Sequence, residues 1–132
     1  ASSIELTWNT SPGAFSYEIL RASTGTSYVS VGSASATPAF TDAVAPNSAH
    51  IYKVRAFEPV LFYASPLSAP DAAVATSFTD EPAIAGTTPV KADHVLELRQ
   101  AANALRALAS LAPAVFTDTA LLGTAIKAIH LT

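Results

Sequence analysis

The segment SIELTWN, residues 3–9, decides the fold of the N-terminal half, because apolar and polar residues alternate along it. Ile4, Leu6 and Trp8 fall on one face of an extended chain, and the polar residues between them fall on the other. Further strands of this kind, each bounded by turn residues, are predicted at 15–22, 26–33, 38–43, 49–57 and 67–76. Short strands that follow one another at this spacing predict a β-sandwich.

The composition narrows the classes of partner. Hydrophobic residues make up 50% of the 132 residues and charged residues 13%, against about 25% charged residues in a typical soluble domain. The net charge is −3 with only 7 lysines and arginines, so no basic patch for nucleic acid is expected. Cysteine is absent, which excludes disulfides and thiolate zinc sites. No apolar run reaches about 18 residues, so no membrane insertion is expected.

Several motifs occur in an order typical of one family. The sequence IELTW at 4–8 has the pattern of a strand with a core tryptophan, and YEILR follows at 17–21. FTD at 40–42 and YKVRA at 52–56 complete the set. Together they resemble a fibronectin type III domain over about residues 3–76. The resemblance implies a mainly β, fibronectin-III-like (immunoglobulin-like) sandwich, and it implies nothing about a ligand.

The sequence departs from this family at two places. His50 stands where the family carries a tyrosine that ties a loop to the backbone. Only Ala1 and Ser2 precede the first predicted strand, so the sandwich is expected to lack its first strand. The open edge of the first predicted strand would then need another strand or segment to pair with it. The candidates are a strand from another copy, a later stretch such as 113–118, or residues outside this sequence.

The second half is predicted to be helical. Thr88 and Pro89 predict the start of a helix, and Pro113 predicts its end. The predicted apolar stripe comprises Val95, Leu98, Ala102, Leu105, Leu108 and Ala112. Arg99 and Arg106 are expected to lie off that stripe.

A repeat of Phe-Thr-Asp, a glycine and a helix start divides this half into units 78–115 and 116–132, the second truncated. The paired positions are Phe78 and Phe116, Asp80 and Asp118, Gly86 and Gly123, Lys91 and Lys127, and His94 and His130. Such units bury their apolar faces by stacking on one another. The segment is similar to tandem repeats at the ends of bacterial secreted multidomain proteins. We therefore predict a sandwich at 1–76 and a helical repeat region at 77–132.

The histidines raise the question of a metal site. His94 and His130, with Asp80 and Asp118, could form a two-histidine, two-aspartate set across the repeat, but neither histidine has a second ligand at zinc spacing. We favour polar contacts within each unit, with each aspartate capping a turn. His50 is expected at the edge of the sandwich. No nucleotide-binding or nucleophile motif occurs, so we predict no catalytic residue, no metal and no cofactor, and we do not expect an enzyme.

Partner-binding residues are predicted at three places. These are Ile4 and Leu6 on the open strand edge, Val60, Leu61, Phe62 and Tyr63 in the loop at 58–66, and Ile126 and Ile129 in the short terminal helix. The four loop residues either form an exposed patch that needs a partner or pack on the C-terminal helices. Asn9 begins the sequon of residues 9–11 and is a candidate glycosylation site.

These features lead to two hypotheses for function. An incomplete first strand and an incomplete last helix predict a subunit completed by the next copy, as in a filament. The chain would then be a non-catalytic, extracellular structural or adhesive module of a bacterial surface or secreted assembly. The alternative is a spacer or accessory carbohydrate- or protein-binding module of a larger secreted enzyme. Polysaccharide would then be a partner, with Tyr28, Phe62 and Tyr63 as the aromatic candidates.

Overall fold

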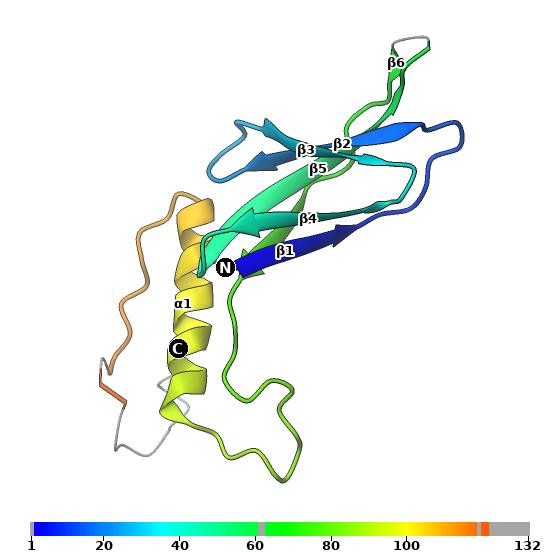
Figure 1. Cartoon of the computed structure of the whole chain (residues 1–132). Helices are drawn as coiled ribbons and strands as arrows, with labels where there is room; N and C mark the ends of the chain where they lie inside the picture. Colours follow the sequence, from blue (N-terminus) through cyan, green and yellow to red (C-terminus); the bar gives the residue numbers. More distant parts are fainter. Residues whose placement is uncertain (1, 61–62, 119, 122–132) are drawn as a thin grey trace.

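The computed structural model describes residues 2–60, 63–118 and 120–121. Figure 1 shows strands followed by one helix. The elements are β1 (Ser2–Thr7), β2 (Ser16–Ala22), β3 (Val29–Ser35), β4 (Ala39–Val44), β5 (Ser48–Glu58), β6 (Tyr63–Ala64), β7 (Asp71–Ala75) and α1 (Ala92–Leu108). The alternation of apolar and polar residues in the sequence therefore predicted every one of these strands except β6. None of the described helices is long and apolar enough to cross a membrane.

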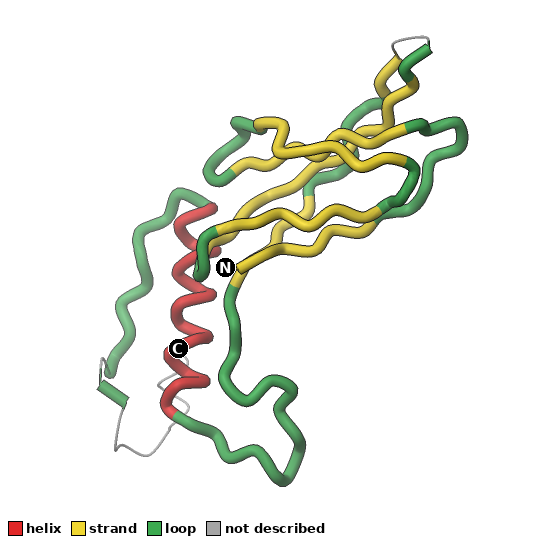
Figure 2. Tube along the Cα trace, viewed as in Figure 1, coloured by secondary structure: helices red, strands yellow, loops and turns green. Residues whose placement is uncertain are grey.

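The strands form two antiparallel sheets that pack face to face (Figure 2). One sheet pairs β1 with β4, and the other has the order β3–β2–β5, with both β6 and β7 paired to β5. This arrangement is the fibronectin-III-like sandwich that the sequence predicts. In the described residues β1 pairs with β4 alone, so its other backbone edge carries no strand there.

The core lies between the two sheets. Its buried members are Ile4, Ile19, Tyr52 and Ala75, and partly buried apolar residues such as Leu6 and Trp8 pack against them. The Trp8 ring meets Tyr17 edge to face, with ring centroids 5.3 Å apart. Burying an aliphatic side chain of this size contributes about 1.5–3 kcal/mol. Ile4 and Leu6, predicted as partner contacts, therefore serve the core of their own domain, and only the backbone edge of β1 remains for pairing.

A polar cluster links the two sheets inside this core. Asp42 on β4 is 7% exposed, and its Oδ2 accepts hydrogen bonds from Arg21 Nη1 and from the Tyr52 hydroxyl, both at 2.8 Å. Arg21 and Tyr52 are opposite each other on β2 and β5. One carboxylate therefore joins both central strands of the larger sheet to the smaller sheet. Burial and the hydrogen bond to Asp42 raise the pKa of Tyr52 above 10.0.

His50, at the place of the family's tyrosine, ties two turns together. It is 8% exposed, with Nδ1 3.1 Å from Ser23 Oγ and Nε2 3.0 Å from Ser48 Oγ. Ser48 Oγ donates to the carbonyl of Ala45, so it accepts from His50 Nε2–H and leaves Nδ1 to accept from Ser23. This arrangement needs a neutral ring. Burial, followed by the charge of Arg21, lowers the pKa of His50 below 6.5.

The predicted start of the helix at Thr88 is wrong. Thr88 Oγ1 accepts a hydrogen bond from the Ile84 amide at 2.8 Å, so this side chain closes the turn around Gly86 and does not cap a helix. Lys91 is the N-cap residue. Its amide donates to His94 Nδ1 at 3.2 Å, which satisfies one backbone donor at the helix start.

The predicted stripe of α1 is also partly wrong. Val95 and Leu108 are buried, but Leu98 and Leu105 are 49% and 44% exposed. Arg99, predicted to lie off the stripe, is 7% exposed. The reason is that α1 packs on β5 and β7 at one end of the sandwich (Figure 1), while loop segments flank its first half. A long arginine stem can lie in such surroundings when its head group is hydrogen-bonded.

The stretch 113–118, one candidate cover for β1, lies along α1 instead. The Ala114 amide donates to Asn103 Oδ1 at 2.8 Å. The Arg99 guanidinium lies over the Phe116 ring, 4.5 Å from its centroid. This segment therefore does not seal the edge of the sandwich.

Replacing Asp42 tests the polar cluster. We expect Asp42→Ala to lower the free energy of unfolding by about 3 kcal/mol, because it leaves Arg21 and the Tyr52 hydroxyl without their acceptor. Tyr52→Phe removes one hydrogen bond and should cost about 1 kcal/mol. The control is Glu18→Ala, which breaks the half-exposed pair with Arg55 and should cost less than about 1 kcal/mol. Urea unfolding measures all three, and equal losses for Asp42→Ala and Glu18→Ala would contradict the role of the cluster.

The pKa of His50 predicts a pH dependence of stability. Because that pKa is lower in the folded chain than its ordinary 6.5, the unfolded chain takes up the proton first as the pH falls. The free energy of unfolding should therefore decrease below pH 6.5. His50→Gln should flatten the curve between about pH 5 and 7, measured by urea unfolding. A variant curve as steep as that of the unchanged protein would show that His50 is not the titrating group.

Candidate functional site

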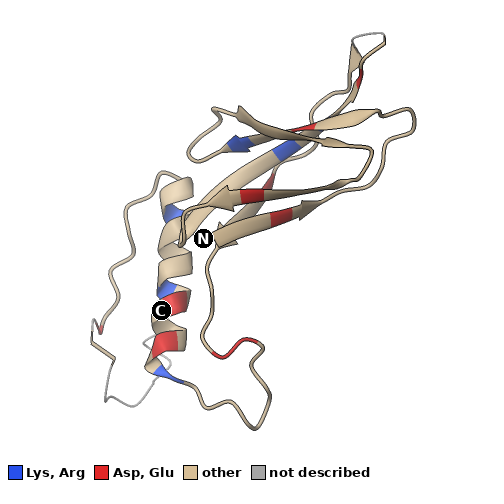
Figure 3. Cartoon of the chain, in the orientation of Figure 1, with Lys and Arg blue, Asp and Glu red and all other residues tan. Residues whose placement is uncertain are grey.

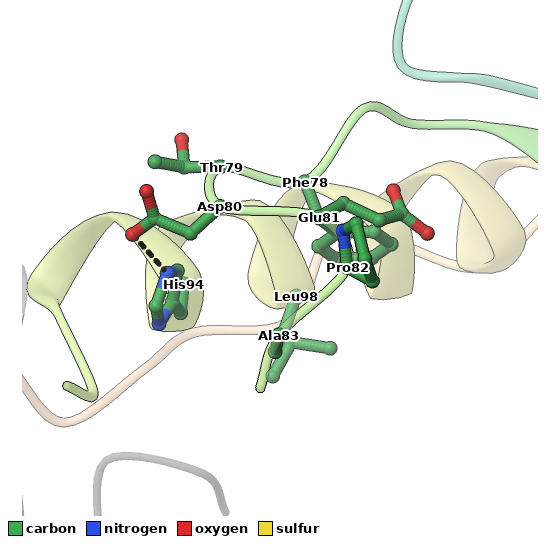
Figure 4. A pocket seen from close by; sticks show the side chains of 8 residues that line it. All are labelled: Phe78, Thr79, Asp80, Glu81, Pro82, Ala83, His94 and Leu98. Carbon is green, nitrogen blue, oxygen red and sulfur yellow. Dashed lines mark ion pairs between the residues drawn. The ribbon is translucent and has the colours of Figure 1, made fainter. Parts of the chain in front are cut away.

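An open cavity lies between the segment 78–83 and the first half of α1 (Figure 4). Its volume is about 440 Å³. The lining residues are Phe78, Thr79, Asp80, Glu81, Pro82, Ala83, His94 and Leu98. The walls are mostly apolar, and the rim carries carboxylates. Figure 3 shows acidic residues, in red, on the loop before α1 and on the first half of the helix.

Asp80 holds the loop to the start of α1. Its backbone is left-handed, with φ 58°, a conformation that aspartate tolerates better than most residues. Oδ2 pairs with Lys91 Nζ and lies 3.4 Å from His94 Nε2. The hydrogen bond and charge of Lys91, with a smaller contribution from His94, lower the pKa of the Asp80 carboxyl.

Thr79 docks on the next turn of the same helix. Its amide donates to Glu97 Oε2 at 2.9 Å, and its hydroxyl donates to Glu97 Oε1. These two hydrogen bonds lower the pKa of Glu97. The Phe-Thr-Asp motif is therefore clasped to α1 by ionic and hydrogen-bonded contacts from consecutive residues.

His94 takes part in this clasp as a polar contact. Nδ1 accepts from the Lys91 amide, so the ring hydrogen lies on Nε2, the atom that faces Asp80. Among the described residues no group of three or more potential metal ligands is found. His130, the proposed partner in a shared metal site, lies outside the described residues. Within the described chain His94 and Asp80 therefore make the polar contact within one unit that we favoured.

The second Phe-Thr-Asp motif lies against α1 as well. The Arg99 guanidinium carbon lies 4.5 Å from the centroid of the Phe116 ring, and Nη1 donates to the Asp118 carbonyl. A second cavity, between Leu96, Asn103 and Val115, borders this contact. The repeat in the sequence identified both motifs, but nothing in it predicted that both would contact the same helix, α1.

The hairpin tip is an exposed apolar feature of the sandwich. Val60 is 80% exposed and Tyr63 64% exposed, while Leu61 and Phe62 lie outside the described residues. The tip projects from the end of the sandwich opposite α1 (Figure 1). The described tip residues therefore do not pack on the helical region, which was one of the two alternatives.

The other predicted site residues are placed as follows. Asn9 is exposed in the loop after β1, where its side chain is accessible. Ile126 and Ile129 lie outside the described residues. Tyr28, a candidate aromatic for sugar binding, lies under Lys53, with Nζ 4.8 Å from the ring centroid.

Comparison with known proteins yields likenesses of structure. No protein-family model and no curated protein matches the sequence. A Fn3-like protein from Clostridium thermocellum is similar, with 27% identity and a TM-score of 0.49 over 54% of this chain and 74% of that chain. A β-1,2-glucanase from Parabacteroides distasonis is similar over 77% of this chain and 13% of its own, with 22% identity and a TM-score of 0.52. At 22% identity, the similarity to the glucanase concerns the fold alone.

The clasp of Phe-Thr-Asp on α1 can be tested by hydrogen exchange. Glu97→Ala removes both acceptors of Thr79, so the Thr79 amide should exchange several-fold faster than in the unchanged chain. Asp93→Asn, which removes a carboxylate on the same helix, is the matched control and should leave Thr79 unaffected. Equal exchange rates at Thr79 in both variants would mean that Glu97 does not hold the loop.

Proposed function

We propose that this chain is a non-catalytic structural and adhesive module that acts through its surfaces in an extracellular bacterial assembly. The main support is that the polar side chains with unusual surroundings are used inside the chain, while apolar side chains are exposed on its surface. Its chemically distinctive side chains, Asp42, His50 and Arg99, are buried in contacts within the chain, whereas apolar residues of the hairpin tip face solvent. A sandwich of this kind supports many functions, so the surface residues carry the proposal.

Two features support the finer proposal that copies self-associate, in a surface or secreted filament. Among the described residues β1 pairs with β4 alone, so its other backbone edge could pair with a further strand. Val60 and Tyr63, at the hairpin tip, add apolar surface that gains from contact with a partner. The β1 edge belongs to the smaller sheet and the tip to the larger one, so one copy could contact the next in head-to-tail order.

The second candidate is a spacer or accessory module of a larger secreted enzyme. The likeness in fold to a β-1,2-glucanase favours it, since the matching part is only 13% of that chain. The repeat supports this candidate too, because α1 contacts its own Phe-Thr-Asp motif and the next one, as stacked units do. Cell-surface or secreted location and a polysaccharide partner belong to the same proposal.

Sedimentation velocity over a wide concentration series tests self-association. We expect the sedimentation coefficient to rise with concentration, and Val60→Asp combined with Tyr63→Ser to weaken this rise, because both changes remove apolar surface at the tip. Val115→Asp is the matched control, since Val115 is 96% exposed but lies beside α1. A concentration-independent monomer would exclude the filament and leave the spacer role, and an equal effect of both variants would exclude the tip as the contact.

A further inference from the structure

The two Phe-Thr-Asp motifs, at 78–80 and 116–118, make different contacts with α1, and one of these differences points to a ligand chemistry. In the second motif Arg99 stacks on the Phe116 ring at 4.5 Å and donates Nη1–H to the Asp118 carbonyl. Arg99 is 7% exposed, so its guanidinium is shielded from water, which strengthens a cation–π contact. This motif therefore binds an arginine that a helix presents.

The first motif carries the same groups without an arginine. Phe78 keeps 36% exposure and lines the cavity of about 440 Å³. In the described part of the chain no cation lies over its ring and no donor reaches the backbone carbonyl of Asp80. The motif thus has the aromatic ring of the second motif without a cation on it, and open space lies beside that ring.

The charge at this cavity also favours a cation. Lys91 and His94 contact the carboxylate of Asp80, whereas Glu81 has no cationic partner among the described residues. Figure 4 shows the Glu81 side chain on the side of the cavity away from His94. An incoming guanidinium would therefore find a carboxylate beside an aromatic ring, which suits its flat, multiply donating head group better than the compact ammonium of lysine.

We propose that the cavity at Phe78–Glu81 binds an arginine side chain presented by a helix of another polypeptide. All arginines of this chain are already engaged within it: Arg21 with Asp42, Arg55 with Glu18, Arg99 with the second motif and Arg106 with the Ala112 carbonyl. This inference goes beyond the proposed function, because it concerns a different surface from the hairpin tip and the β1 edge. It stands whether or not copies of the chain associate.

A titration followed by nuclear magnetic resonance tests the arginine chemistry. The probe is N-acetyl-arginine methylamide, and the control is the citrulline analogue, which has the same shape and no charge. We expect saturable shifts at the amides of Thr79, Asp80, His94 and Leu98, with the citrulline analogue binding about fivefold more weakly. Equal shifts with both compounds, or no shifts at these amides, would overturn the proposal.

Two variants locate the site, one at the aromatic ring and one at the carboxylate. Phe78→Leu should abolish the preference for arginine over citrulline, while Phe15→Leu, at a phenylalanine 66% exposed elsewhere, should retain it. Glu81→Gln, a surface change, should weaken arginine binding without changing citrulline binding. Retention of the full preference in Phe78→Leu or in Glu81→Gln would place the arginine site elsewhere.

A peptide with the sequence of α1, residues 92–108, tests the requirement for a helix. It should shift the amides of 79–81 at a lower concentration than the single amino-acid probe, and replacing its equivalent of Arg99 by citrulline should remove the advantage. Shifts confined to 114–118 would instead mean that the peptide exchanges with α1 at the second motif, which would count against the first cavity as a docking site.

Discussion

The buried carboxylate of Asp42 is the interaction on which the rest of the structure depends. The smaller sheet contains only β1 and β4 in the described residues, so it offers less apolar surface to the core than a wider sheet would. Arg21 and Tyr52, from both central strands of the other sheet, converge on this one carboxylate. Because burial makes an unpaired charge costly, the cluster also fixes how the two sheets are aligned.

That alignment determines where the helical region sits. The start of β5 and the end of β7 lie at one end of the sandwich, and α1 packs on both strands there. The hairpin tip is at the other end, so its apolar side chains cannot be covered by α1. The molecule therefore presents two separate surfaces, an apolar tip and an acidic cavity beside a helix, which differ in the partners they suit.

The strands could be predicted from the sequence because sheet burial follows a period of two, and Ile4 and Ile19 obey it. The helix was predicted less well. Thr88 has the side chain of a helix cap, but its hydroxyl serves a local turn, and nothing in the local sequence distinguishes the two uses. β6 has two residues, too few to produce a pattern.

The candidate site was predicted only in outline. The sequence showed that Phe78, Asp80 and His94 recur at 116, 118 and 130, and the structure brings Phe78, Asp80 and His94 together at the cavity beside α1. The sequence did not show that Arg99 would be buried, because its hydropathy predicts an exposed arginine. In the structure the guanidinium stacks on the Phe116 ring and donates to the Asp118 carbonyl. Such long-range contacts depend on the tertiary arrangement, and periodicity contains no information about them.

The segment after α1 is held in an unusual way, by helix side chains that bond its main chain. Arg106 donates to the carbonyl of Ala112, Asn103 accepts from the amide of Ala114, and Arg99 donates to the carbonyl of Asp118. Every amino acid supplies a carbonyl, and all but proline supply an amide. These three contacts therefore do not depend on which side chains the segment carries at 112, 114 and 118, whereas replacing the helix side chains that make them would remove them.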